Sequence, residues 1–135
     1  MTDPIVPVSW GELLDKVAIL EIKRLRLRSA EAVANAEREL AALAPALGLL
    51  VPAPAGLAEL RAALAAVNQR LWTIEDRIRE RDAEGDFGPA FVALARSVYR
   101  ENDERGRIKR AINTLLGSGL VEEKQYSAHG GQTGG

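Results

Sequence analysis

Apolar residues recur at steps of three and four along two long stretches of this chain, and this spacing limits the fold more than any other feature. The first stripe consists of Leu57, Leu60, Leu64, Val67, Leu71, Ile74 and Ile78. The second consists of Phe87, Phe91, Leu94, Val98, Ile108, Ile112 and Leu115, and it is interrupted by Glu101 and Arg105. This period places apolar side chains on one face of an α-helix. The sequence therefore predicts an all-α fold with a coiled-coil-like seam.

Start and stop signals divide the chain into three expected helices. Ser9, with Glu12 three residues later, forms a capping-box pattern, so the first helix is expected from Ser9 to just before Pro45. That gives about 35 residues and a rod of roughly 50 Å. The second helix is expected at about 54–82 and the third at about 88–116, with Gly117 as a stop signal. The link between them is short, which predicts an antiparallel three-helix bundle with a long first helix.

The two ends of the chain lack the patterns of packed structure. The first ten residues carry no basic segment followed by an apolar one, so they do not resemble a signal peptide. The ending HGGQTGG has no apolar residue to bury. We therefore expect one helical-bundle domain at 1–126 and a disordered tail at 127–135.

Composition restricts the function classes. The chain has 18 basic and 19 acidic residues, with both signs interleaved, so we expect neither nucleic acid nor a membrane as a partner. It has no cysteine, which fits a reducing, cytoplasmic location. His129 stands alone in the Gly-rich tail, so no metal site is expected. No nucleotide-binding or catalytic motif is present, and we expect no cofactor.

Charged residues also fall inside the apolar arcs of the first and third expected helices. In an up-down-up bundle the fixed rise per residue would bring charges from all three helices to one level. The predicted charged layer contains Glu21, Arg24, Arg28, Glu75, Glu101 and Arg105, with Asn102 and Lys109 at its edges. Acids and bases balance, so the layer could be an internal ion-pair network that fixes helix register. The alternative interpretation is a pocket in which Arg24, Arg28 and Arg105 bind an anionic small molecule.

Four segments resemble a known family. They are SWGELLDKVAILEIK at 9–23, LWTIEDRIR at 71–79, FVALARSVYRENDERGRIKRAIN at 91–113 and VEEKQY at 121–126. The chain is similar over nearly its whole length to a family of short bacterial proteins with a domain of unknown function. The resemblance implies no activity or cofactor. It directs attention to the polar residues in those segments, namely Glu12, Asp15, Lys16, Glu75, Asp76, Asn102, Arg105, Lys109, Glu123, Lys124 and Tyr126.

Two function classes follow. The first is a non-enzymatic interaction or accessory protein whose partner is another protein or a second copy of the chain. In this hypothesis the long first helix would overhang its neighbours near 33–43, leaving apolar surface for a homodimer. The alternative is a small helical enzyme or metabolite-binding protein that uses the predicted Arg and Glu layer. The sequence leaves both classes open.

Overall fold

The computed structural model describes residues 1–120 and residue 123, and all regular structure in this part of the chain is helical. The helices are α1 (Trp10–Arg26), α2 (Ala30–Leu47), the short 3₁₀ helix η1 (Gly48–Leu50), α3 (Leu57–Ala83) and α4 (Pro89–Leu116). The tail predicted to be disordered, 127–135, lies outside the described residues. No helix in the described part is long and apolar enough to cross a membrane.

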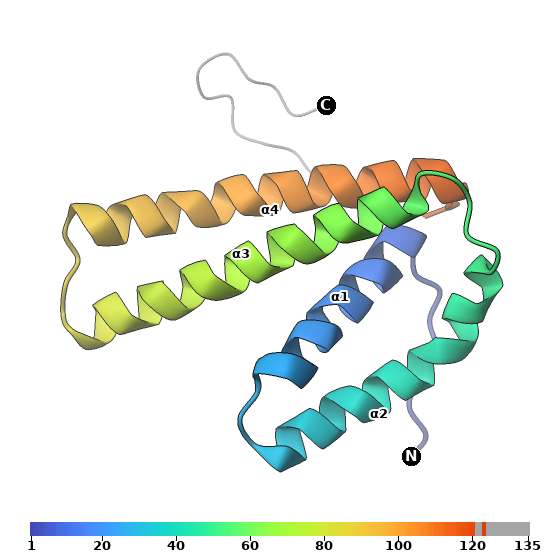
Figure 1. The fold of residues 1–135 in the computed structure, drawn as a ribbon, viewed down its shortest axis with the longest axis horizontal. Helices are drawn as coiled ribbons and strands as arrows, with labels where there is room; N and C mark the ends of the chain where they lie inside the picture. The colour runs from blue at the N-terminus through green and yellow to red at the C-terminus, as the bar shows by residue number, and fades with distance from the viewer. Residues whose placement is uncertain (121–122, 124–135) are drawn as a thin grey trace.

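The helices form two antiparallel pairs that meet at one end of the molecule (Figure 1). One pair is α3 and α4, the longest helices. The other pair is α1 and α2, and α1 lies between α2 and the first pair. In the described part of the chain α2 packs against α1 and η1 but not against α3 or α4. The element bounds and the antiparallel α3–α4 pairing confirm the second and third helices predicted from the sequence.

The prediction of one long first helix is wrong, because the chain turns back at Leu27–Ser29. Leu27 and Ser29 have extended backbone conformations. The Ser29 hydroxyl accepts a hydrogen bond from the Ala32 N–H at 3.1 Å, which caps the first turn of a new helix. Instead of the expected three-helix bundle, the described part of the chain has four α-helices and the short η1. Pro45, expected to end the first helix, lies inside the last turns of α2.

This turn also removes the overhang expected at 33–43. That segment is part of α2, which folds back along α1, and Lys16 on α1 pairs with Glu39 on α2 at 3.3 Å. Ala36 is the only residue of α2 that is fully buried. The apolar surface expected to be free for a second copy is thus partly covered by α1.

The core lies where α1 crosses the α3–α4 pair. Leu14, Leu64, Val67, Ile108 and Ile112 form its centre, with Leu50 of η1 and Leu57 closing one side. Every buried residue of α3 lies at 57–71, and every buried residue of α4 lies at 106–113. We call the remaining halves, 72–83 of α3 and 89–100 of α4, the arm. In the arm the seam residues Ile78, Phe91 and Leu94 are only partly buried, because two helices cannot enclose a seam alone.

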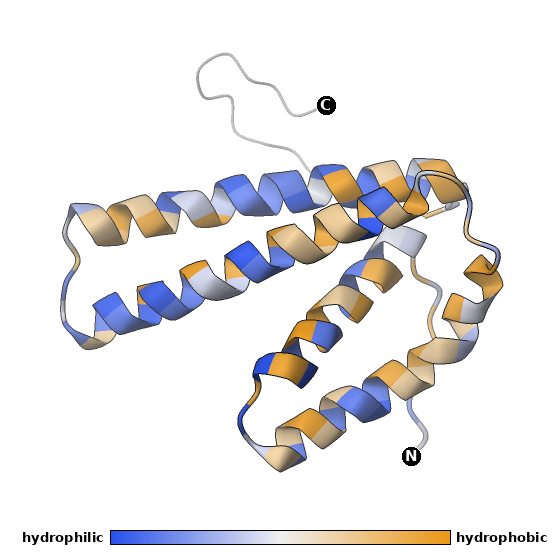
Figure 2. Cartoon of the chain, viewed as in Figure 1, coloured by the Kyte–Doolittle hydropathy of each residue, from blue (hydrophilic) through white to orange (hydrophobic). Residues whose placement is uncertain are grey.

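A glycine in a left-handed conformation ends α4 where the sequence predicts. Gly117, with φ of 66°, ends α4, and the Ser118 N–H donates to the Asn113 carbonyl at 2.9 Å. Gly85, with φ of 69°, lies in the turn between α3 and α4. In Figure 2, α3 is largely hydrophilic in the arm and more hydrophobic near the core, whereas α4 begins in the arm with hydrophobic residues and is hydrophilic in its middle.

Candidate functional site

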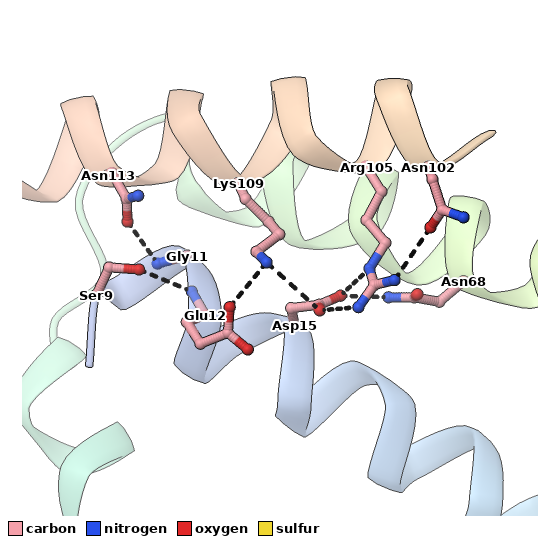
Figure 3. Close-up of polar contacts among 9 residues, drawn as sticks. All are labelled: Ser9, Gly11, Glu12, Asp15, Asn68, Asn102, Arg105, Lys109 and Asn113. Carbon is pink, nitrogen blue, oxygen red and sulfur yellow. Dashed lines mark hydrogen bonds and ion pairs between the residues drawn. The ribbon is translucent and has the colours of Figure 1, made fainter. Parts of the chain in front are cut away.

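A group of polar side chains lies where α1, α3 and α4 meet (Figure 3). We call it the polar cluster. It consists of Glu12 and Asp15 on α1, Asn68 on α3, and Asn102, Arg105, Lys109 and Asn113 on α4. Residues 102, 105, 109 and 113 are spaced by three or four, so they share one face of α4.

Asp15 is the centre of the polar cluster and is 1% exposed. Its Oδ1 accepts hydrogen bonds from Arg105 Nε and from Asn68 Nδ2, both at 2.9 Å. Its Oδ2 accepts from Arg105 Nη2 at 2.5 Å. Arg105 also donates to Asn102 Oδ1 at 3.2 Å, which fixes the guanidinium plane. A buried carboxylate loses its hydration, and this two-point contact with the guanidinium replaces it.

Lys109 supplies the second cation of the polar cluster and is 8% exposed. Its Nζ donates to Glu12 Oε2 at 2.8 Å and lies 4.0 Å from Asp15 Oδ2. Two acids on α1 thus face two bases on α4. Within the described residues these four charges are paired with one another, which offsets the cost of burying them.

Hydrogen bonds also connect the first turn of α1 with the end of α4. The Gly11 N–H donates to Asn113 Oδ1 at 2.7 Å, and the Trp10 N–H donates to Ser118 Oγ at 2.9 Å. The Glu12 N–H donates to Ser9 Oγ at 3.1 Å, as the capping pattern predicts. Helix N-termini leave such N–H groups without intrahelical partners, and here other parts of the chain satisfy three of them.

Glycine at position 11 permits this approach. A Cβ atom there would lie 2.5 Å from the Lys109 carbonyl oxygen and 2.9 Å from Asn113 Oδ1. The first of these is a backbone atom, so it cannot rotate away. Gly11 therefore fixes how closely α1 approaches α4, and with it the register that brings Asp15 opposite Arg105.

The structure brings together only part of the charged layer predicted from the sequence. Asn102, Arg105 and Lys109 belong to the polar cluster. Glu101 is half-buried, but it pairs with Arg70 at 2.9 Å outside the polar cluster. Glu75 is exposed on the arm, with Arg79 at 4.0 Å.

The predicted residues of the first helix lie elsewhere. Glu21, Arg24 and Arg28 are exposed, so the expectation that they lie inside the bundle is wrong. The reason is the turn at Leu27–Ser29, which ends α1 before a third long helix can follow the α3–α4 pair. Arg24 and Arg28 therefore cannot form an internal anion pocket with Arg105.

Sequence reasoning missed Asp15, Glu12, Asn68 and Asn113 as members of the polar cluster. The three-and-four spacing of polar residues along α4 was a signal that could have extended the predicted layer to Asn113. Of the polar residues in the segments that resemble a known family, Glu12, Asp15, Asn102, Arg105 and Lys109 meet here. Lys16 pairs with Glu39, Glu123 is exposed, and Lys124 and Tyr126 lie outside the described residues.

Shifted pKa values occur on α4 outside the polar cluster. A hydrogen bond from Arg107 lowers the pKa of Glu104, although partial burial opposes this. A hydrogen bond with Arg100 lowers the pKa of Tyr99, and the positive charge of Arg100 lowers it further. Arg96 acts in the same direction. These are surface contacts between neighbouring turns, and they form no catalytic group with the polar cluster.

The chemistry open to the polar cluster is narrow. Within the described residues no group of three or more His, Cys, Asp and Glu side chains could hold a metal ion. The Asp15 carboxylate already accepts three hydrogen bonds from its own chain. A pocket of about 470 Å³ lies away from the polar cluster, on the arm, and is lined by Arg77, Glu80, Arg81, Ala90, Ala93 and Leu94.

Comparisons with known proteins place the chain in a family without assigning it an activity. Neither the curated proteins nor the solved structures contain a match. The model of a family of unknown function, DUF6165, matches residues 5–132. Because this match covers most of the 135 residues, the chain belongs to the family of unknown function DUF6165.

Proposed function

We propose that this protein is a non-catalytic helical interaction protein. The observation that carries the proposal is the enclosure of Asp15, which is 1% exposed and whose two carboxylate oxygens already accept three hydrogen bonds from Arg105 and Asn68. A general base needs a lone pair directed at a substrate proton, and a binding site for anions needs cations that are not held by acids. The polar cluster instead has the properties of an internal ion-pair network that fixes helix register.

The arm is the proposed contact surface. Near the core, α1 packs against both α3 and α4, whereas none of the residues of the arm is buried by another helix of the described chain. At about 100° per residue, Ala95 and Val98 fall on the side of α4 that carries Lys109 and Asn113, which face α1. Ala95 is exposed, and Tyr99 beside it is 53% exposed. The side of α4 that α1 covers near the core is therefore exposed and partly apolar in the arm.

We propose a second copy of the chain as the occupant of this surface. Two arms related by a two-fold axis would lie antiparallel and form a four-helix bundle, in which each arm covers the other's seam. An isologous contact of this kind needs only one surface, and the arm supplies it. A cytoplasmic location is part of the same proposal and fits a chain with no cysteine.

Sedimentation velocity at micromolar concentrations tests the dimer. Ala95→Glu would place a charge in the proposed contact and should convert the dimer to a monomer. Ala93→Glu is the matched control, because Ala93 is also exposed on α4 but projects to the opposite side. A monomeric wild-type protein, or two variants that sediment alike, would rule out the arm as the dimer contact.

A second candidate function rests on the pocket of about 470 Å³ on the arm. Arg77 and Arg81 line it, and Arg81 is held by Asp86 at 3.2 Å. This alternative is a protein that binds an anionic metabolite through Arg77. A thermal-shift screen with sugar phosphates, dicarboxylates and nucleotides would detect it, since a ligand at a hundred times its dissociation constant adds about 2.7 kcal/mol. The shift should vanish in Arg77→Met and persist in Arg79→Met, and no shift with any ligand would exclude it.

A further inference from the structure

The turn that divides the predicted first helix carries a concentrated basic sequence. Residues 23–28 read Lys-Arg-Leu-Arg-Leu-Arg, and we call them the basic corner. Its four cationic residues are all exposed. Leu25 is 77% exposed, whereas Leu27 is partly buried. Positive charge and an apolar side chain therefore share one small surface.

The charges of the basic corner are not neutralised by acids of the described chain. No acid of that part of the protein lies within ion-pair distance of Lys23, Arg24, Arg26 or Arg28. By contrast, Lys16 on the same helix pairs with Glu39, and Arg105 and Lys109 pair with Asp15 and Glu12. The even mixture of charges in the whole sequence thus conceals a local excess of positive charge.

Stabilisation of the helix end accounts for only part of this pattern. Basic side chains in the last turn of a helix interact favourably with its dipole, which applies to Lys23, Arg24 and Arg26. Arg28 lies beyond the helix, in the connection to α2. The exposed Leu25 gains nothing from the dipole, and its exposure costs solvation free energy. A ligand that binds cationic side chains and an apolar side chain side by side would account for all the residues of the basic corner.

The position of the basic corner suits a large flat partner. Figure 1 shows the α1–α2 connection at the free end of that helix pair, remote from the end at which α1 meets α4. In Figure 2 this connection is strongly hydrophilic with hydrophobic residues interspersed. Ile22 is the last buried residue of α1, so the corner projects beyond the packed part of the helix.

We propose that the basic corner docks the protein on the surface of an anionic phospholipid bilayer. Lipid phosphates would contact the four cations, and the Leu25 side chain would enter the boundary between headgroups and acyl chains. A nucleic-acid backbone would also attract the cations, but it offers no apolar region for Leu25 next to the phosphates. The exposed leucine therefore favours lipid. The inference does not depend on the dimer or on the arm.

Co-sedimentation with vesicles tests the proposal. The wild-type protein should bind vesicles that contain phosphatidylglycerol, should not bind pure phosphatidylcholine vesicles, and should dissociate as salt is raised. The triple variant Arg24→Gln, Arg26→Gln, Arg28→Gln should lose about a hundredfold in binding. Its melting temperature should fall by only a few degrees, since these side chains are exposed and form no ion pairs, and only Arg24 and Arg26 lose a weak interaction with the helix dipole. Arg38→Gln, Arg70→Gln, Arg107→Gln has the same net charge as the triple variant and should bind as the wild type does, because these arginines are exposed and lie outside the basic corner and the arm.

A fluorescent label distinguishes insertion from general attraction. The chain has no cysteine, so Leu25→Cys provides a single attachment point for a polarity-sensitive dye. Leu49, at 76% exposed, matches Leu25 in exposure and lies in η1, so Leu49→Cys is the control. Emission should shift to the blue with anionic vesicles only for the label at position 25. Equal binding to both vesicle types, equal shifts at both positions, or tighter binding to an oligonucleotide than to vesicles would overturn the proposal.

Discussion

Asp15 connects three helices, because its carboxylate accepts hydrogen bonds from Asn68 on α3 and Arg105 on α4 while its backbone belongs to α1. Gly11, one turn earlier, lets α1 approach α4 closely enough for these bonds to form. A small residue and a charged residue thus act together. Hydrophobic packing alone is tolerant of small rotations, whereas this ion pair selects one register.

Replacement of Asp15 by Asn tests the polar cluster. Asp15→Asn keeps the shape of the side chain but leaves Arg105 and Lys109 facing each other without the central negative charge. We expect the free energy of unfolding to fall by about 3 kcal/mol. Urea denaturation followed by circular dichroism measures it. Glu12→Gln is the control and should cost less than about 1 kcal/mol, because the Glu12 side chain is half exposed. Equal losses in the two variants would contradict the central place given to Asp15.

Gly11→Ala tests the close approach of α1 and α4. Alanine favours helix by about 1 kcal/mol over glycine. Here the added methyl group would meet the Lys109 carbonyl oxygen, so we expect a net loss of about 2 kcal/mol in the free energy of unfolding. Gly48→Ala, where no atom lies within 4 Å of the new Cβ, should be neutral or stabilising by the same measurement. A stabilised Gly11→Ala protein would show that the two helices can separate without cost.

Among the elements, the sequence predicted α3 and α4 well and the N-terminal half poorly. The seams of α3 and α4 are long, and glycines end them, so period and stop signals agree. The turn at Leu27–Ser29 has no proline or glycine, and apolar residues continue on both sides of it. Its sole local signal was Ser29, which lacks the Glu or Gln three residues later that completes a capping box. The chain turns at Leu27–Ser29 because α2 can then pack against α1 and bury part of its surface. This is a tertiary effect, which the local sequence does not reveal.

The same error displaced half of the candidate site. Arg24 and Arg28 were assigned to the interior because a continuous first helix would run the length of the bundle. Asn102, Arg105 and Lys109 lie in one group, and their spacing on α4 predicts this independently of the first helix. The sequence does not predict Asp15 as their partner. The three- and four-residue spacing of apolar residues does not show whether an acid between them is buried or exposed.

Ser29→Ala tests the cap that begins α2. The variant should lose about 1 kcal/mol in the free energy of unfolding, because the Ala32 N–H loses its partner. Ser97→Ala is the matched control. Its hydroxyl donates to the Leu94 carbonyl within α4, a bond that weakly disfavours the helix, so alanine there should be neutral or slightly stabilising. If Ser29→Ala is also neutral, the turn is imposed by packing of α2 on α1 and does not need the cap.

At the scale of the whole molecule, the protein has a core at one end and two free extensions. The arm extends from the core in one direction, and the α1–α2 pair ends in the basic corner (Figure 1). The polar cluster lies at the core end, where it fixes the angle between the extensions. The two proposed contact surfaces are therefore on separate parts of the molecule, and a substitution in one should leave the other intact.

The hydrogen bond between the Trp10 N–H and Ser118 Oγ has a topological consequence. It brings the beginning of the first helix to the end of the last, so the helical body is nearly a closed ring of chain. A linker of about six Gly and Ser residues spans roughly 20 Å and could close that ring. New ends could then open between Gly85 and Asp86, at the tip of the arm.

Such a circular permutant should fold to the same helical content and melt within a few degrees of the parent protein, as circular dichroism would measure. If the permutant fails to fold, the connection between α3 and α4 at Gly85–Asp86 must be intact for the protein to fold. A permutant that folds would mean that the order in which the helices are joined is incidental to the architecture, and that the contacts around Asp15 and Gly11 are enough to assemble it from either starting point.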